Sequence, residues 1–193
     1  CRAFCFIPYF NLRLCFFCIF GEIDLNIMAD NYLEKKFEEF RSGKPAAVKH
    51  KSASNNPSLD SLLLKNRSYR GYDSSYKVSE EELRKIVGVC TKIPSGRNAQ
   101  LLRYRLVTEE EAPRVQKLTK WGAALPELNL PFPGTEPNAF IIICSTVAEN
   151  KWVDIDLGIA SQSMLLKAVE MGLNGICIGA FNKERLMEEF KLE

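Results

Sequence analysis

The region over residues 79–90 has apolar positions at helical spacing. Leu83, Ile86 and Cys90 fall on one face of a 3.6-residue repeat, which predicts an amphipathic helix. Ser79 and Glu82 stand just before the stripe, at the spacing of a capping box, in which each side chain bonds the backbone amide of the other residue. We therefore expect this helix to begin at Ser79.

Three other runs predict strands. The segment "AFIIICS" at 139–145 is apolar at six consecutive positions, which is typical of a strand buried on both faces. The segments "RYRLVT" at 103–108 and "GICI" at 175–178 predict two shorter strands. The chain is therefore of mixed class, with more helix than strand.

Apolar stripes and capping residues predict the remaining helices. A stripe over 156–172 predicts a helix packed in the core. Its members are Leu157, Ala160, Met164, Leu165 and Ala168. Asn182 can cap a last helix that carries Leu186 and Phe190. Thr108 can cap a helix that runs through Leu118.

The segment before residue 59 contains one short helix and a linker. Residues 32–41 carry apolar positions at helical spacing, which predicts a short amphipathic helix. Residues 44–58 are rich in Ser, Asn, Pro and Lys, a composition typical of a linker. The leucines at 62–64 then predict a helix that ends close to a cluster of arginines.

Residues 1–27 differ in composition from the rest of the chain. They are mostly apolar, but Asn11 and Arg13 interrupt the run, which falls short of the ~20 apolar residues of a membrane-spanning helix. Three interpretations remain open: a translated leader outside the functional protein, a membrane anchor or signal remnant, and an element packed in the fold. We expect a leader, with the functional protein beginning at Met28.

The overall composition indicates one globular domain and argues against two classes of partner. The 193 residues are 46% apolar and 26% charged, which is enough for a sizeable core. Lys and Arg number 26 against 24 Asp and Glu, so a net charge of +2 provides no field that would attract nucleic acid or an acidic membrane. We expect neither partner.

The seven cysteines indicate a reducing compartment. Cys90, Cys144 and Cys177 lie in apolar runs, where a reduced cysteine behaves as a small hydrophobe. The segment "CFFC" at 15–18 has the spacing of metal ligands, but no second ligand pair accompanies it and the one histidine, His50, is distant. We expect a cytoplasmic protein without a metal site.

The segment "RSYR" is the first candidate for binding chemistry. Arg67 and Arg70 can supply charge to a phosphate, and the hydroxyl of Ser68 adds a neutral hydrogen bond. Taken alone, the segment is more typical of two solvated arginines near the favourable dipole of a helix end.

Two later segments present polar groups from turns. Ser95, Asn98 and Gln100 in "PSGRNAQ" can donate to and accept from the edge of a heterocycle. Gly179 and Ala180 in "GICIGAF" follow a strand, and their small side chains let a flat ring approach the backbone amides. The alternatives are an ordinary loop for the first segment and a strand-to-helix turn for the second.

Taken in order, three segments resemble the FMN-dependent nitroreductase family. They are "NRSYRGYD", "IPSGRNAQLL" and "DIDLGIASQSMLLKAVEMGLNGICIGAFNKERLMEEFKL". The resemblance implies an α+β fold with three α-β-α layers around a central, mainly antiparallel sheet. It also implies that 59–193 is the FMN-binding domain, C-terminally incomplete relative to the family, preceded by a helix and linker at 28–58.

The resemblance assigns roles to nine residues. The loop that holds the FMN phosphate, ribityl chain and pyrimidine edge corresponds to Arg67, Ser68 and Arg70. The turn beside the isoalloxazine corresponds to Ser95, Asn98 and Gln100, and the stretch whose amides approach flavin N5 corresponds to Ile178, Gly179 and Ala180. No catalytic side chain is implied, because the flavin carries the chemistry.

The implied activity is an NAD(P)H-dependent FMN oxidoreductase that acts as a homodimer with FMN at the subunit interface. Hydride would pass from NADH or NADPH through the flavin to an electron-poor small molecule such as a nitroaromatic or a quinone. Asn66 stands where many members carry a further arginine, and Leu101 and Leu102 replace the usual Pro-Trp. The alternative is a truncated, non-catalytic relative that binds flavin weakly or serves as an interaction module.

Overall fold

A computed structural model describes residues 15–20, 57–122, 126–147 and 150–192, with 15–20 as backbone alone. The elements of the described ranges follow in chain order. They are β1 (Cys15–Phe20), α2 (Leu59–Lys65), α3 (Glu80–Val87), the 3₁₀ turns η1 (Gly88–Thr91) and η2 (Gly96–Asn98), β2 (Leu102–Val107), α4 (Ala112–Gln116), the 3₁₀ turn η3 (Pro126–Leu128), β3 (Phe140–Ser145), α5 (Lys151–Glu170), β4 (Asn174–Ile178) and α6 (Lys183–Phe190).

The strands form one sheet in the order β2-β3-β1-β4. All three pairings are antiparallel: Leu102 lies opposite Ser145, Cys15 opposite Ile143, and Phe16 opposite Ile178. The predicted strands at 103–108, 139–145 and 175–178 are confirmed as β2, β3 and β4. The expected antiparallel sheet is confirmed with them.

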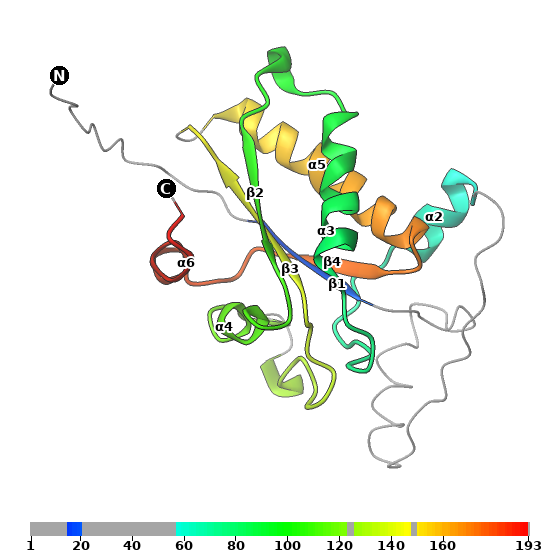
Figure 1. Cartoon of the computed structure of the whole chain (residues 1–193), viewed down its shortest axis with the longest axis vertical. Helices are drawn as coiled ribbons and strands as arrows, with labels where there is room; N and C mark the ends of the chain where they lie inside the picture. Colours follow the sequence, from blue (N-terminus) through cyan, green and yellow to red (C-terminus); the bar gives the residue numbers. More distant parts are fainter. Residues whose placement is uncertain (1–14, 21–56, 123–125, 148–149, 193) are drawn as a thin grey trace, which may run out of the picture.

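Helices cover both faces of this sheet, which confirms the three-layer architecture. α3 and α5 lie on one side and α4 and α6 on the other (Figure 1). β3 is buried along its whole length and divides its side chains between two clusters. Ile141 and Ile143 pack with the residues of α3 and α5, whereas Phe140 and Ile142 pack with those of α4 and α6. This alternation follows from the two-residue period of a strand.

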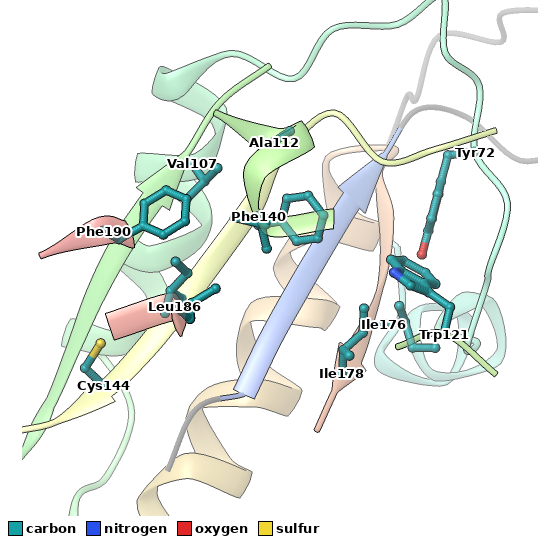
Figure 2. Close-up of a cluster of buried hydrophobic side chains, with 12 residues drawn as sticks. Tyr72, Val107, Ala112, Trp121, Phe140, Cys144, Ile176, Ile178, Leu186 and Phe190 are labelled. Atoms are coloured by element: carbon teal, nitrogen blue, oxygen red, sulfur yellow. The ribbon is translucent and has the colours of Figure 1, made fainter. Parts of the chain in front are cut away.

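The cluster on the α4 and α6 side anchors the end of the chain. Leu186 and Phe190 of α6 belong to one cluster with Phe140 of β3, in which Phe190 lies beside Val107, while Ile176 and Ile178 of β4 lie toward Trp121 (Figure 2). Both α6 residues are buried. The side of β4 that carries Ile176 and Ile178 therefore belongs to the core.

The capping predictions are confirmed at two helices. The amide of Ser79 donates to Glu82 Oε2 at 2.8 Å, and the amide of Glu82 donates to Ser79 Oγ at 3.3 Å. Asn182 caps α6 by accepting from the amide of Arg185 at 3.0 Å. Each pair completes orphan amides of a first helical turn.

The boundaries of two other helices differ from the prediction. α5 begins at Lys151, before the stripe that starts near residue 156, because Asn150 caps it by accepting from the amide of Trp152 at 2.9 Å. α4 begins at Ala112, and the carbonyl of Thr108 accepts from the amide of Ala112 at 2.9 Å in a turn before it. Pro113 favours that later start, since proline fits the first turn of a helix.

The strand Cys15–Phe20 differs from the expectation that residues 1–27 stand outside the fold. The structure places it between β3 and β4 and pairs it with both. Six consecutive apolar residues are enough for a strand, and a central strand satisfies the backbone groups of both neighbours. The helix expected at 32–41 lies outside the described residues. Across the described ranges, no helix combines the length and the apolar character needed to cross a bilayer.

Candidate cofactor site

A cavity of about 300 Å³ lies beside β4, on the side of the sheet that α5 covers. Its lining comes from the loop after α2 (Asn66, Arg67, Ser68 and Arg70), from α5 (Gln162 and Leu165) and from β4 (Gly175, Ile176 and Cys177). The first predicted binding segment is therefore brought against the strand that carries the third.

Hydrogen bonds at the end of α2 place the arginine loop next to β4. The amide of Asn66 closes the helix by donating to the carbonyl of Leu62 at 2.9 Å. The side chain of Asn174, which is buried at the start of β4, donates from Nδ2 to the carbonyl of Lys65 at 2.8 Å. The loop therefore leaves α2 at a fixed point beside the strand.

The charges at this cavity favour an anion. Among the residues that the structure describes, neither Arg67 nor Arg70 forms an ion pair with a carboxylate, and no carboxylate lines the cavity. Arg70 Nη1 donates to the carbonyl of Ser68 at 3.1 Å, which folds the loop back on itself. Burial raises the pKa of the neighbouring Tyr69, and the charge of Arg67 offsets part of that rise. Within the part of the chain that the structure describes, one cavity is thus lined by two guanidinium groups that have no carboxylate partner.

The second predicted segment, the turn at 95–100, is held from beneath by α5. Ser95 Oγ donates to Asp156 Oδ2 at 2.6 Å, and the amide of Gly96 donates to Asp156 Oδ1 at 2.8 Å. Ser95 Oγ also accepts from the amide of Gln100 at 2.9 Å. One carboxylate and one hydroxyl therefore connect both ends of the turn to the helix.

The backbone of this turn is unusual for residues other than glycine. Arg97, Asn98 and Gln100 have positive φ angles of 56°, 53° and 49°, a region that side chains disfavour. Gly96 packs on Trp152 so closely that an added Cβ would lie 2.8 Å from Trp152 Cε3. The guanidinium of Arg97 lies 5.7 Å from the centre of the same indole ring.

The structure does not bring this turn to the cavity of its own chain. Ser95, Asn98 and Gln100 are absent from the cavity's lining. Asp156, which holds the turn, and Gln162, which lines the cavity, are six residues apart on α5, roughly 9 Å along the helix axis. The predicted residues thus occupy two places along one helix.

The third predicted segment follows directly after the residues of β4 that line the cavity, and none of its three residues is among the lining residues. The side chain of Ile178 is buried in the cluster of Figure 2, together with that of Ile176. Gly179 and Ala180 follow it, and the carbonyl of Ala180 accepts from the amide of Lys120 at 2.7 Å. An added Cβ at Gly179 would meet no atom within 4 Å, so the backbone there is open to close approach.

Three residues of this region were missed by the sequence analysis: Gln162, Cys177 and Asp156. Gln162 and Cys177 line the cavity, and Asp156 is 4% exposed beneath the turn. The signal for two of them was present, because Asp156 and Gln162 are polar positions in a helix that is otherwise largely apolar. Cys177 gave no signal beyond its place in a strand.

The arrangement is that of an α+β protein with a cationic cavity at the edge of an antiparallel sheet. The model of the nitroreductase family matches residues 63–193. The chain belongs to the nitroreductase family, and so to a class of oxidoreductases. The matched range covers the arginine loop, the turn and β4 together.

Two solved structures have a similar fold. A nitroreductase family protein from Clostridium novyi NT matches with a TM-score of 0.55 and 18% sequence identity, over 70% of this chain and 77% of that one. An oxidoreductase described as containing FMN matches with a TM-score of 0.56 and 18% identity, over 76% of each chain. At this identity the two likenesses support the fold. No curated protein matches the chain.

Proposed function

We propose that this chain is an FMN-dependent oxidoreductase that moves a hydride from NAD(P)H to an electron-poor small molecule such as a nitroaromatic or a quinone. The observation that carries the proposal is the pair Arg67 and Arg70, which have no ion-pair partner among the described residues and line a cavity beside β4. Membership of the nitroreductase family and likeness to an FMN-containing oxidoreductase support the same cofactor.

The donor set fits the phosphate end of FMN. Arg67 and Arg70 supply two cations and Ser68 a hydroxyl, the combination that charge-assisted phosphate binding requires. Gln162 adds an amide that can donate to and accept from the ribityl chain or the ring edge. The volume of about 300 Å³ lies at the lower end of the range of ligand pockets. A flavin supplies the hydride chemistry when it is bound, and these residues bind and orient it.

We further propose a homodimer with the cofactor at the subunit interface. α5 faces the sheet on one side and leaves Ile155 49% exposed on another, and α2 leaves Leu59 and Leu64 60% and 70% exposed. Apolar residues exposed on two helices that contact each other fit an interface with a second copy of the chain. The second copy would also bring a 95–100 turn to the cavity that the chain's own turn does not line.

The cysteines fit a cytoplasmic location. Burial raises the pKa of the Cys144 thiol to about 11 and also raises that of Cys90, although a hydrogen bond with Tyr104 offsets part of the second shift. Both thiols therefore stay protonated at neutral pH and react slowly with oxidants. We propose the cytoplasm as the compartment, because its reducing conditions suit cysteines that remain free thiols.

Reconstitution with FMN tests the proposed activity. Titration of the purified protein with FMN should quench flavin fluorescence to saturation, and anaerobic addition of NADH or NADPH should bleach the flavin absorbance. A nitroaromatic or quinone should then restore the absorbance, and sedimentation should give a dimer. A protein that takes up no FMN, or whose bound FMN neither nicotinamide reduces, would support the non-catalytic alternative and overturn the proposal.

A further inference from the structure

A buried carboxylate, that of Asp156, lies beneath the turn at 95–100 and hydrogen-bonds to it. Asp156 is 4% exposed, in a helix whose neighbouring core positions are apolar. A buried carboxylate is unfavourable unless hydrogen bonds compensate it. Both oxygens of Asp156 are used: Oδ2 accepts from Ser95 Oγ at 2.6 Å and Oδ1 from the amide of Gly96 at 2.8 Å.

These two hydrogen bonds fix a backbone that the local sequence disfavours. Ser95 Oγ also accepts a hydrogen bond from the amide of Gln100 at 2.9 Å, which fixes the far end of the turn. Between these anchors Arg97, Asn98 and Gln100 all have positive φ. Such conformations persist where the surroundings determine them, and they concentrate at ligand sites.

The opposite side of the turn faces solvent. Asn98 and Gln100 are exposed, and Gln100 Nε2 donates to Asn98 Oδ1 at 3.1 Å, so each amide retains further donors or acceptors. The buried side of the turn is therefore anchored, and the exposed side presents amide groups in one arrangement. This division is what a preformed contact surface for a planar ring requires.

We propose that Asp156 is a positioning residue for the flavin ring, acting through Ser95 and Gly96 to hold Asn98 and Gln100 in the conformation that meets the isoalloxazine bound in the cavity of the second copy of the chain. This inference rests on the proposed flavin binding and adds the residue that shapes its ring end. Asp156 does not touch the ring, because the turn lies between them. Its effect therefore differs from that of Arg70, which serves the phosphate end.

Two ligands separate the two ends of the site: FMN, and riboflavin, which lacks the phosphate. Asp156→Asn in the 193-residue chain should weaken binding of both ligands by about tenfold, since Asn98 and Gln100 would lose their fixed arrangement and would have to be ordered when the ring binds. Arg70→Ala should weaken FMN alone. The matched control is Asp154→Asn, an exposed carboxylate on the same helix, which should leave both dissociation constants unchanged.

The absorption spectrum of the bound flavin gives a readout that general loss of stability would not move. Asp156→Asn should change the band shape of bound riboflavin, whereas Arg70→Ala should not change that of bound FMN. If Asp156→Asn does not fold, Ser95→Ala removes the linking hydroxyl from a folded chain and should give the same pattern with a smaller loss.

The outcomes distinguish this inference from the proposed function. If the unsubstituted chain binds neither ligand, the proposed function fails. If it binds both and neither Asp156→Asn nor Ser95→Ala changes the riboflavin dissociation constant or the spectrum, the role of Asp156 is overturned. A loss confined to FMN would also overturn it, because the effect would then lie at the phosphate.

Discussion

The arginine loop and the turn at 95–100 differ in how the protein holds them. In the loop, Arg70 donates a hydrogen bond to the carbonyl of Ser68, and neither arginine has a carboxylate partner among the described residues. The turn is anchored by Asp156 and Ser95 and packs on Trp152. One end of the proposed site is thus shaped by the protein, and the other is completed by an anion.

This difference teaches how the binding free energy is divided. A preformed turn loses little conformational entropy when a ligand arrives, so it mainly selects the shape of the ligand. Long arginine side chains lose rotamer freedom on binding but gain charge-assisted hydrogen bonds. The turn should therefore govern which ring is accepted, and the arginine loop how tightly a phosphorylated ligand is held.

The largest effect is expected from removal of β1, because β4 reaches β3 only through that strand. A chain that begins at Gly21 should lose the wall of the cavity that β4 provides and lose cooperative unfolding. The destabilisation should exceed the ~4–5 kcal/mol that single substitutions rarely pass. Thermal unfolding by circular dichroism measures it, with a chain that begins at Cys15 as the control.

An unchanged transition in the chain that begins at Gly21 would contradict the placement of β1. It would restore the interpretation of residues 1–27 as a leader outside the fold. FMN titration of the same chain adds a second criterion, since the cavity depends on Gly175 and Cys177 of β4.

Substitution in the arginine loop should change binding while leaving stability nearly unaltered. Arg70→Ala should cost about 1.5–3 kcal/mol of FMN binding, roughly a ten- to hundredfold higher dissociation constant. Lys77→Ala is the matched control, because Lys77 is half exposed and pairs with Glu109 at 2.6 Å, away from the cavity. Fluorescence titration and urea unfolding of both variants test the difference. Equal dissociation constants for the two would remove Arg70 from the site.

The turn should show the reverse pattern in the absence of ligand. Gly96→Ala would place a Cβ 2.8 Å from Trp152 Cε3, so the helix or the turn must shift. Such overpacking should lower the free energy of unfolding by about 1–3 kcal/mol. Gly179→Ala is the control, because nothing lies within 4 Å of its added Cβ. Urea unfolding without flavin measures both. Equal stability of the two variants would mean that the turn is less tightly held than its contacts indicate.

The sequence predicted well the features that depend on neighbouring residues. The capping box of Ser79 and Glu82 needs residues three apart, and the cap of α6 by Asn182 likewise uses a local side chain. The strand β3 could be predicted because a strand buried on both faces is apolar along nearly its whole length. The roles of Arg67 and Arg70 came from the family resemblance, since a loop of arginines by itself does not identify a ligand.

Features that depend on distant partners escaped prediction. Ser95 and Asp156 are 61 residues apart, and nothing in either local pattern indicates the other. The run Cys15–Phe20 is equally compatible with a leader and with a strand, and its partners β3 and β4 lie in the second half of the chain. Tertiary pairing, which no local period encodes, decides both cases.

The smallest expected effect concerns the segment that joins the arginine loop to the turn. Tyr76 donates a hydrogen bond to Glu82 at the start of α3. That bond, with burial, raises the pKa of Tyr76 to about 12. Burial alone would raise the pKa of Glu82, but hydrogen bonds from Tyr76 and Ser79 outweigh it and lower the value.

The pH dependence follows from the direction of each shift. The hydrogen-bonded Tyr76 hydroxyl adds to the free energy of unfolding. This addition is fully present below the ordinary tyrosine pKa near 10 and is lost as the pH rises toward about 12. The contribution of Glu82 is present above the usual carboxylate pKa and is lost as the pH falls through its lowered value. Tyr76→Phe should therefore remove part of the alkaline loss and part of the acid loss of stability. Because the pair is only partly buried, both changes should be small.

Urea unfolding of the unsubstituted chain and of Tyr76→Phe across this alkaline range tests the first change, and a tyrosinate absorbance titration of the variant should lose one group that titrates near pH 12. Glu82→Gln is the companion variant, because it removes the acceptor's charge and should return the pKa of Tyr76 toward its ordinary value. If the alkaline loss were the same in all three proteins, Tyr76 would not bond Glu82 in solution.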